Sequence, residues 1–345
     1  NPHSDIALGL GPDIFEKNKP AVVPDVDNII DIYAGGMHTV CLTADGEVIT
    51  WGCNDEGALG RETTEEGSET EPGKVDLPEK AVIITAGDSH SAALLESGRV
   101  FAWGSFRDSH GTMGLTPSGI QKVPVELVLP TRVLKLASGA DHLALLTVDG
   151  QVYTCGCGEQ GQLGRLPERS AQRNNRLGIG RSSLFPKKYS SFLTAGVAGT
   201  AKSKVYAFGL NNYNQLGKQT SALILSKRIH VIFCLTLCVT YAIGRKEYGR
   251  LGLGDIDEDA LVPTVIPTLK DKNVVNIASG SAVSFAVSDD GEVWGWGMGT
   301  NNQLGTGDDE DLLIPTKISG KQLETRSVLQ VSAGGQHTVL LAKNK

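Results

Sequence analysis

The sequence predicts an all-β protein, a seven-bladed β-propeller with about four short antiparallel strands per blade. Two observations point to this fold. The chain repeats itself at a period of about 52 residues, and each repeat carries a hairpin turn signal at the same place. A unit of about 50 residues with four short strands is the size of one propeller blade. We therefore expect a single propeller domain over residues 1–345.

Four copies of the repeat have the same length in their central part. Each combines a Gly-rich turn, an Asp-Gly or Ser-Gly pair typical of tight hairpins, and a strand of alternating apolar residues that ends in a Trp-Gly-type phrase. The copies read IYAGGMHTVCLTADGEVITWG (32–52), ITAGDSHSAALLESGRVFAWG (84–104), LASGADHLALLTVDGQVYTCG (136–156) and IASGSAVSFAVSDDGEVWGWG (277–297).

Six Trp-Gly-type phrases indicate six repeats, at about 29–80, 81–132, 133–189, 190–227, 228–273 and 274–327. Near the N-terminus, IALGLG (6–11) resembles the Leu-Gly end of a seventh phrase, and VSAGGQHTVLLAKNK (331–345) is a half-copy that lacks this end. We expect residues 1–28 and 328–345 to pair in a composite seventh blade. Such pairing removes the open sheet edge of an unclosed ring.

Blades four and five are predicted to be incomplete. Only 35 residues separate Phe208 from Ile243, where other repeats have 52 or 53. The shortfall equals about one strand and its turn. We expect fewer strands between residues 190 and 243 than in the other blades.

Composition restricts the class of protein. A net charge of −7 argues against a general nucleic-acid binder, and the apolar run at 231–243 is shorter than the ~20 residues that span a bilayer. The chain begins with Asn rather than Met, which suggests a missing N-terminal piece. Reduced core thiols are favoured over a metal site or disulfides, as in a cytosolic or nuclear protein. The cysteines are Cys41, Cys53, Cys155, Cys157, Cys234 and Cys238.

One repeat carries an insertion. In five phrases the last Gly follows the first letter by nine residues, whereas in WGSFRDSHGTMG (103–114) it follows by eleven. A unique excursion from a repetitive scaffold is a candidate functional loop, because rigid frameworks carry function on their loops. Drift in a surface loop is the alternative.

The repeats resemble the family of the regulator of chromosome condensation. The resemblance rests on GGMHTVCL, WGCNDEGALGR, AGDSH, WGSFRD, CGEQGQLGR, EYGRLGLG, GKQLE and GGQHTVLL, and it covers nearly the whole chain. It implies a seven-bladed propeller that acts as a guanine nucleotide exchange factor for the small GTPase Ran. Exchange involves no covalent chemistry and no cofactor or metal. The resemblance also implies a monomer in the nucleus, on chromatin and away from membranes.

The same resemblance implies the site residues. The wedge against the GTPase would be Phe106, Arg107, Asp108, Ser109, His110, Gly111, Thr112 and Met113. Further residues on the GTPase-facing side would be Asp88, Asp141, Arg165, Asp311 and His337. For Asp88 and Asp141 a turn-capping role is the alternative.

A basic loop at 165–188 has seven Arg and Lys residues and a single Glu, so it suits an acidic partner. A solvated linker is the alternative. The resemblance implies that the loop contacts the acidic patch of the histone dimer on the nucleosome, through Arg173, Arg176 and Arg181. DNA would be contacted by a basic N-terminal tail that this chain lacks.

Four histidines recur at one position of the repeat: His38, His90, His142 and His337. Symmetry spreads them around the axis, so we expect structural hydrogen bonds to neighbouring backbone rather than a shared metal ion.

Two other functions compete with exchange. A propeller interaction module without exchange activity is favoured by the incomplete fifth blade. An enzyme with its active site in the central channel of the propeller is the other alternative. No Ser/His/Asp set or pair of carboxylates with suitable spacing supports it.

Overall fold

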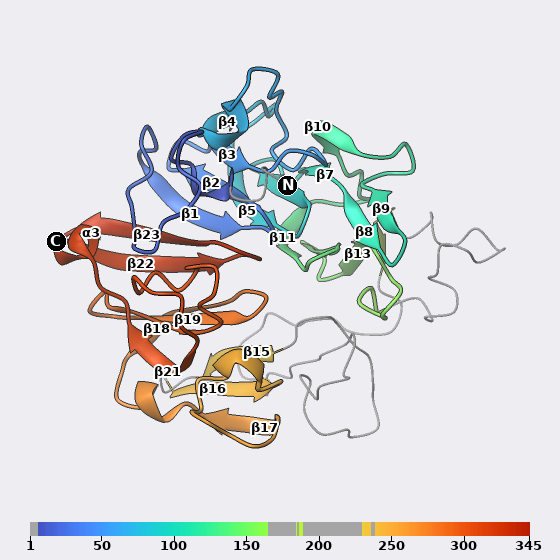
Figure 1. Cartoon of the computed structure of the whole chain (residues 1–345). Helices are drawn as coiled ribbons and strands as arrows, with labels where there is room; N and C mark the ends of the chain where they lie inside the picture. Colours follow the sequence, from blue (N-terminus) through green and yellow to red (C-terminus); the bar gives the residue numbers. More distant parts are fainter. Residues whose placement is uncertain (1–5, 165–183, 185, 189–229, 236–238) are drawn as a thin grey trace.

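The computed structural model describes residues 6–164, 184, 186–188, 230–235 and 239–345. All the sheets in these residues are antiparallel, and they are arranged around a common axis (Figure 1). This confirms the all-β propeller architecture. The fourth repeat, expected at 190–227, falls outside the described residues.

Four of the sheets in the described residues have four strands. The first contains β1 (Ile29–Ala34), β2 (His38–Thr43), β3 (Val48–Gly52) and β4 (Gly73–Val75). The second contains β5 (Ala81–Ala86), β6 (His90–Leu95), β7 (Val100–Gly104) and β10 (Gln121–Glu126). The third contains β11 (Val133–Ser138), β12 (His142–Thr147), β13 (Val152–Gly156) and β14 (Lys187–Lys188). The sheet of the sixth repeat contains β18 (Val274–Ser279), β19 (Val283–Ser288), β20 (Val293–Gly297) and β21 (Leu312–Lys317).

The remaining elements are smaller. A fifth-repeat sheet contains β15 (His230–Leu235), β16 (Val239–Gly244) and β17 (Ala260–Val265), and the last sheet contains β22 (Arg326–Ala333) and β23 (Thr338–Asn344). The described helices are single turns: η1 (Ile6–Leu8), η2 (Ser68–Thr70), η3 (Glu247–Gly249), η4 (Pro267–Leu269) and α3 (Lys321–Glu324). No helix in the described ranges is long and apolar enough to cross a membrane.

A buried tryptophan side chain lies at each of three contacts between neighbouring blades. The indole Nε1 of Trp103 donates to the carbonyl of Ala58 at 2.8 Å, and that of Trp296 donates to Arg250 at 3.0 Å. In both cases the acceptor precedes a Leu-Gly pair of the previous blade. A glycine is needed in that pair, because a Cβ on Gly60 would lie 2.7 Å from the Trp103 ring.

The N-terminal segment fills the same place in the seventh blade. Trp51 Nε1 donates to the carbonyl of Ala7 at 3.0 Å, and Ala7 precedes Leu8-Gly9. The predicted Leu-Gly end of a seventh phrase is therefore confirmed. Closure differs from the expected strand pairing in one respect. Within residues 6–28 the segment forms η1 and loops, so it closes the ring by packing and hydrogen bonds beside the two-stranded β22–β23 sheet.

The fifth sheet has three strands in the described part of the chain. His230 in β15 pairs with Gly244 in β16, the register in which His38 of β2 pairs with Gly52 of β3. Strand β15 thus corresponds to the second strand of a complete blade, yet it lies against the innermost strand β18 of the next blade. Within the described residues the fifth blade is therefore three-stranded. The prediction for residues 190–229 lies outside the described residues.

Cys41, Cys53, Cys155 and Cys157 are free thiols. Burial raises the pKa of Cys41 to about 12 and that of Cys157 to about 11. Thiols with such pKa values are poor nucleophiles at neutral pH, since the reactive form is the thiolate.

Candidate functional site: a hairpin on an acidic face

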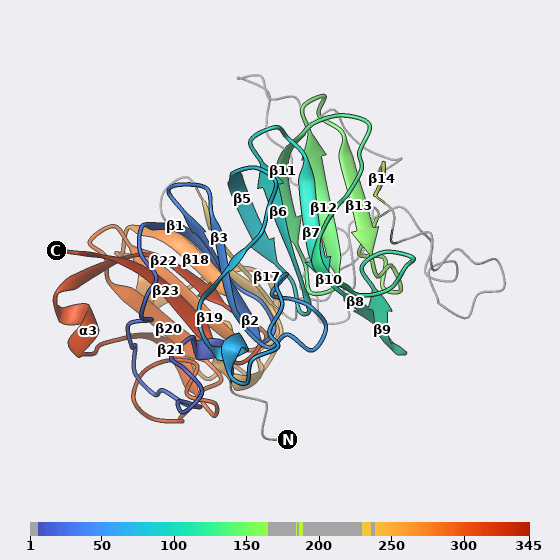
Figure 2. The same cartoon turned by 90° about the horizontal axis from the view of Figure 1, so that it is seen from above.

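The inserted residues of the second repeat form a separate hairpin. Strands β8 (Phe106–Asp108) and β9 (Gly111–Gly114) pair with each other, and Figure 2 shows them projecting beyond the ends of the blade strands. Asp108 is the pairing partner of Gly111, so Ser109 and His110 form the tip. The extra length thus leaves the ring as a protruding element, as predicted.

The base of the hairpin is anchored in the core. Phe106 is only 1% exposed and packs with Leu115, Leu143 and other core residues of the second and third blades. Its ring lies 4.6 Å from the ring of His90, and Met113 packs against the same cluster. Phe106 and Met113 therefore hold the hairpin in place, while residues 107–112 form its outer part.

Three carboxylates from the neighbouring blades hold the hairpin. The backbone N–H of Arg107 donates to Asp141 Oδ1 at 2.8 Å. Thr112 Oγ1 donates to Glu56 Oε1 at 2.7 Å, from the turn that follows β3. On the other side, the backbone N–H of Ser109 donates to Glu159 Oε2 at 2.8 Å, from the turn that follows β13. The hairpin of blade two is thus fixed by blades one and three.

The face beneath the hairpin is acidic. The Arg107 guanidinium lies near Glu56, with Nε 3.8 Å from Oε1. Desolvation raises the pKa of the Asp88 carboxyl, Arg107 opposes this shift, and the charge of Glu56 adds to it. The carboxylates at positions 56, 88, 108, 141 and 159 give the surface a strongly negative potential, which favours basic groups of a partner and disfavours phosphate.

Two of these residues were missed by the sequence reasoning. Glu56 and Glu159 lie in the turns after Gly52 and Gly156, where several repeats also carry polar residues. Nothing in the sequence links them to a hairpin about 50 residues away. Only the arrangement of neighbouring blades brings the two carboxylates to opposite sides of it.

Other predicted site residues are placed differently. Asp311 is exposed in the sixth repeat, where its Oδ1 accepts a hydrogen bond from the Gly299 N–H at 2.9 Å. His337 is 5% exposed and lies between blades, so its side chain does not present a binding surface. Arg165, Arg173, Arg176 and Arg181 lie outside the described residues.

Three of the recurring histidines link one blade to the next. The ring Nε2 of His38 lies 2.9 Å from Ser91 Oγ, and that of His90 lies 3.0 Å from Ser138 Oγ. Each ring thus pairs with a hydroxyl of the next blade, and the His38 ring also has the expected backbone partner, at His90. Burial lowers the pKa of His38 and His90 to about 3. Both rings are therefore neutral at physiological pH.

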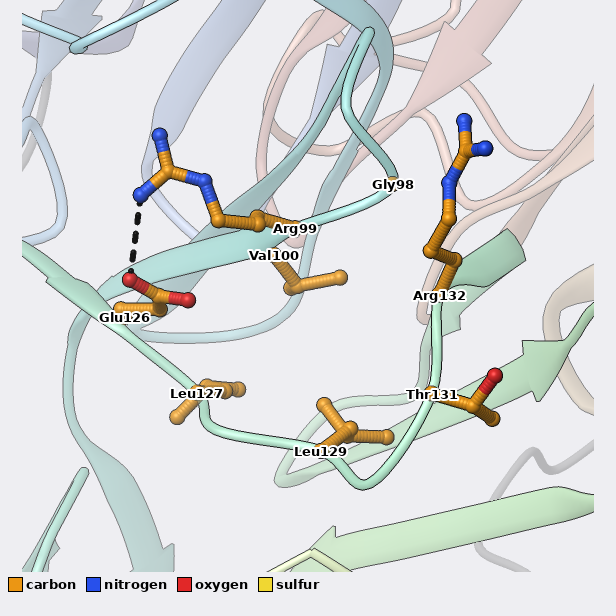
Figure 3. Close-up of a pocket in the computed structure, with 8 residues that line it drawn as sticks. All are labelled: Gly98, Arg99, Val100, Glu126, Leu127, Leu129, Thr131 and Arg132. Carbon is orange, nitrogen blue, oxygen red and sulfur yellow. Dashed lines mark hydrogen bonds and ion pairs between the residues drawn. The ribbon is translucent and has the colours of Figure 1, made fainter.

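A small pocket of about 250 Å³ lies at the opposite end of β7 from the hairpin (Figure 3). Its charged groups are already engaged. Arg99 forms an ion pair with Glu126, and Arg132 Nε donates to the carbonyl of Ser97 at 2.8 Å. The hairpin face, with its cluster of acids, is therefore the better candidate for a functional surface.

Comparisons with known proteins agree with this architecture. The family model of the RCC1-like domain matches residues 3–340. The chain is 50% identical to the regulator of chromosome condensation of Xenopus laevis, over 98% of this chain and 87% of the relative. It is 48% identical to the human protein of that name, over 98% of this chain and 88% of the relative.

A solved structure is also similar. The crystal structure of Prp20p from Saccharomyces cerevisiae, a protein studied for its binding to Gsp1p and histones, matches with a TM-score of 0.84 and 27% identity. The match covers 99% of this chain and 90% of Prp20p. With its repeats, its propeller sheets and these relatives, the chain belongs to the family of RCC1-like propellers, in the branch of the regulator of chromosome condensation.

Proposed function

We propose that this protein is a guanine nucleotide exchange factor for the small GTPase Ran and that it docks on chromatin. The relatives named regulator of chromosome condensation cover nearly the whole chain, which supports this activity over the other functions of repeat propellers. The observation that carries the proposal is the hairpin of residues 106–114. It is the one insertion among the repeat phrases, it protrudes from the ring, and three carboxylates fix its position.

Nucleotide exchange of this kind is explained by thermodynamic linkage between two binding equilibria. A GTPase holds its nucleotide with a phosphate-binding loop, a lysine and Mg²⁺. A protein that binds the nucleotide-free form more tightly than the loaded form lowers the affinity for nucleotide by the same factor. The hairpin tip would displace the phosphate-binding loop, and the acidic face would bind the basic groups that are released from the phosphates.

Rigidity of the hairpin is part of this mechanism. A flexible loop would be pushed aside by the partner, whereas a hairpin anchored by Phe106 and tied down by Asp141 resists displacement. The residues assigned to contact the GTPase are Asp88, Arg107, Asp108, Ser109, His110, Gly111, Thr112, Asp141, Arg165 and Asp311.

We assign docking on chromatin to the basic loop at 165–188. The positive charge of its arginines is complementary to the acidic patch of the histone dimer. Prp20p binds histones, which supports the same partner here. We assign the protein to chromatin in the nucleus as a monomer, with DNA contacted through a basic tail outside this sequence.

The test is the release of a fluorescent GDP analogue from Ran in the presence of catalytic amounts of the protein. Asp141→Ala removes both the charge and the acceptor for the Arg107 N–H, and we expect exchange to slow by about tenfold or more. Asp141→Asn keeps an acceptor oxygen and should retain more activity if positioning is the main role. Asp149→Ala, at the opposite end of β12, is the matched control.

A second candidate function is a propeller interaction module without exchange activity. The 35-residue spacing between Phe208 and Ile243 favours it, because a shortened fifth repeat would weaken the ring on which the GTPase would lie. A folded, monodisperse sample that binds Ran or histones without accelerating GDP release would establish this alternative.

A further inference from the structure

We propose that the hairpin tip and the neighbouring turn of blade three form a binding site for a divalent transition-metal ion of the zinc type. The ligands are Asp108 Oδ1, His110 Nδ1 and Glu159 Oε1, which all lie within 4.8 Å of one another. Two come from the hairpin and the third comes from the adjacent blade. An ion at this place would clamp the hairpin to the ring.

The spacing of the three atoms suits a metal. His110 Nδ1 lies 3.8 Å from Asp108 Oδ1 and 3.8 Å from Glu159 Oε1. Zinc bonds of ~2.0–2.2 Å in tetrahedral geometry place neighbouring ligand atoms about 3.4 Å apart. A contraction of about 0.4 Å would bring each of these two pairs to that distance, whereas the two carboxylate oxygens lie within 4.8 Å of each other. The imidazole is on the exposed tip of a two-stranded hairpin, so it can adjust to an ion.

The surroundings favour a cation. The side chains of Asp108 and Glu159 are 2% and 12% exposed, so their charges are poorly screened by water, whereas the His110 side chain is 41% exposed. Glu56, Asp88 and Asp141 add negative charge to the same face. An ion that reaches the tip from solvent thus meets one accessible ligand and two partly desolvated carboxylates.

A side-chain hydroxyl competes with the ion, and the ligand atom Asp108 Oδ1 also accepts a hydrogen bond from the backbone N–H of His110 at 2.8 Å. Ser109 Oγ lies 3.1 Å from His110 Nδ1 and 3.0 Å from Glu159 Oε1, so its hydroxyl bridges two of the three ligands. Metal binding requires this hydroxyl to rotate away. Replacement of Ser109 by alanine removes the competitor and leaves all three ligands in place.

The ligand set selects the kind of ion. One imidazole and two carboxylates, with positions left open to solvent, suit Zn²⁺, Co²⁺ or Mn²⁺. Mg²⁺ and Ca²⁺ prefer oxygen ligands alone. The Mg²⁺ that a GTPase carries should therefore not compete for this site.

The direct test is a titration of the purified, tag-free chain with Zn²⁺ against a chromophoric chelator, with Mg²⁺ present in millimolar amounts. We expect one bound Zn²⁺ per chain. Affinity should fall by about tenfold or more in His110→Asn and in Glu159→Gln, because each variant removes one of three ligands, whereas Ser109→Ala should bind at least as tightly. Glu126→Gln removes an exposed carboxylate at the opposite end of β7 and serves as the control.

Absence of Zn²⁺ binding, or equal binding by wild type and His110→Asn, overturns the site. The effect on exchange is a separate measurement that rests on the proposed function. Saturating Zn²⁺ should slow GDP release from Ran by wild type more than by His110→Asn, since the clamped tip no longer offers its carboxylates to the GTPase. If the protein has no exchange activity, the chelator titration still decides the metal site.

Discussion

His337 Nε2 lies 3.0 Å from Thr39 Oγ1, although 298 residues separate the two in the chain. Thr39 Oγ1 also contacts the carbonyl of Ala7 at 3.4 Å. The last blade, the first blade and the N-terminal segment therefore meet at a single buried hydroxyl. This is the same inter-blade link that His38 makes with Ser91, used here to close the ring.

Thr39→Val should destabilise the closed ring. The side chain is fully buried, and its loss leaves the His337 ring and the Ala7 carbonyl without this partner. We expect the free energy of unfolding to fall by about 1–3 kcal/mol, measured by urea denaturation. Thr264→Val, at an exposed threonine, is the matched control and should change it by less than about 0.5 kcal/mol. Equal effects of the two substitutions would refute a closing role for Thr39.

Acid should destabilise the protein through its buried histidines. Burial lowers the pKa of His38 and His90 to about 3 and that of His337 to about 4, so the folded state binds fewer protons than the unfolded chain. Their contribution to stability is complete above pH 6.5 and is lost progressively as the pH falls from 6.5 towards 3–4. Each histidine adds a slope of at most about 1.4 kcal/mol per pH unit.

Urea denaturation between pH 8 and pH 5 checks this, in a range above the usual carboxyl pKa values. His90→Gln removes one titrating ring, so its stability should depend less steeply on pH than that of the wild type. A slope that is unchanged in the variant would show that His90 is not the group responsible.

Gly9→Ala should cost more than Gly11→Ala. Both glycines have a positive φ, of +70° and +91°, so each substitution carries the backbone strain of the left-handed region, about 1–2 kcal/mol. A Cβ at position 9 would also lie 2.7 Å from the Trp51 ring, whereas nothing lies within 4 Å of one at position 11. Thermal melts of the two variants give the difference, and similar melting temperatures would contradict a tight fit of Gly9 on Trp51.

Phe106→Ala should loosen the hairpin as well as the core. Loss of a buried phenylalanine typically costs about 3–5 kcal/mol. We therefore expect a lower melting temperature together with faster amide hydrogen exchange in residues 107–112. Phe106→Leu keeps most of the packing volume and should retain both. If Phe106→Ala changes stability but leaves hydrogen exchange in the hairpin unaltered, Phe106 is not its anchor.

The sequence by itself determined the architecture and the position of the unusual loop. The repeat carries its own signals, since Gly-rich turns, Asp-Gly pairs and alternating strands are local features that appear wherever the chain forms a blade. The excess of two residues between Trp103 and Gly114 predicted the excursion for the same reason. The shortened spacing before Ile243 predicted fewer strands, and the fifth sheet has three in the described residues.

Only the tertiary structure decided which side chains surround the hairpin. Glu56 and Glu159 reach it because neighbouring blades lie side by side, and sequence spacing does not encode that distance. The tertiary structure also decided which side chains are buried. The family resemblance assigns Phe106 and His337 to the GTPase-facing side, yet packing between blades buries both. Local pattern sets the strands and turns, whereas contacts between blades set the chemistry of the face, because each blade completes its surface with residues from the next.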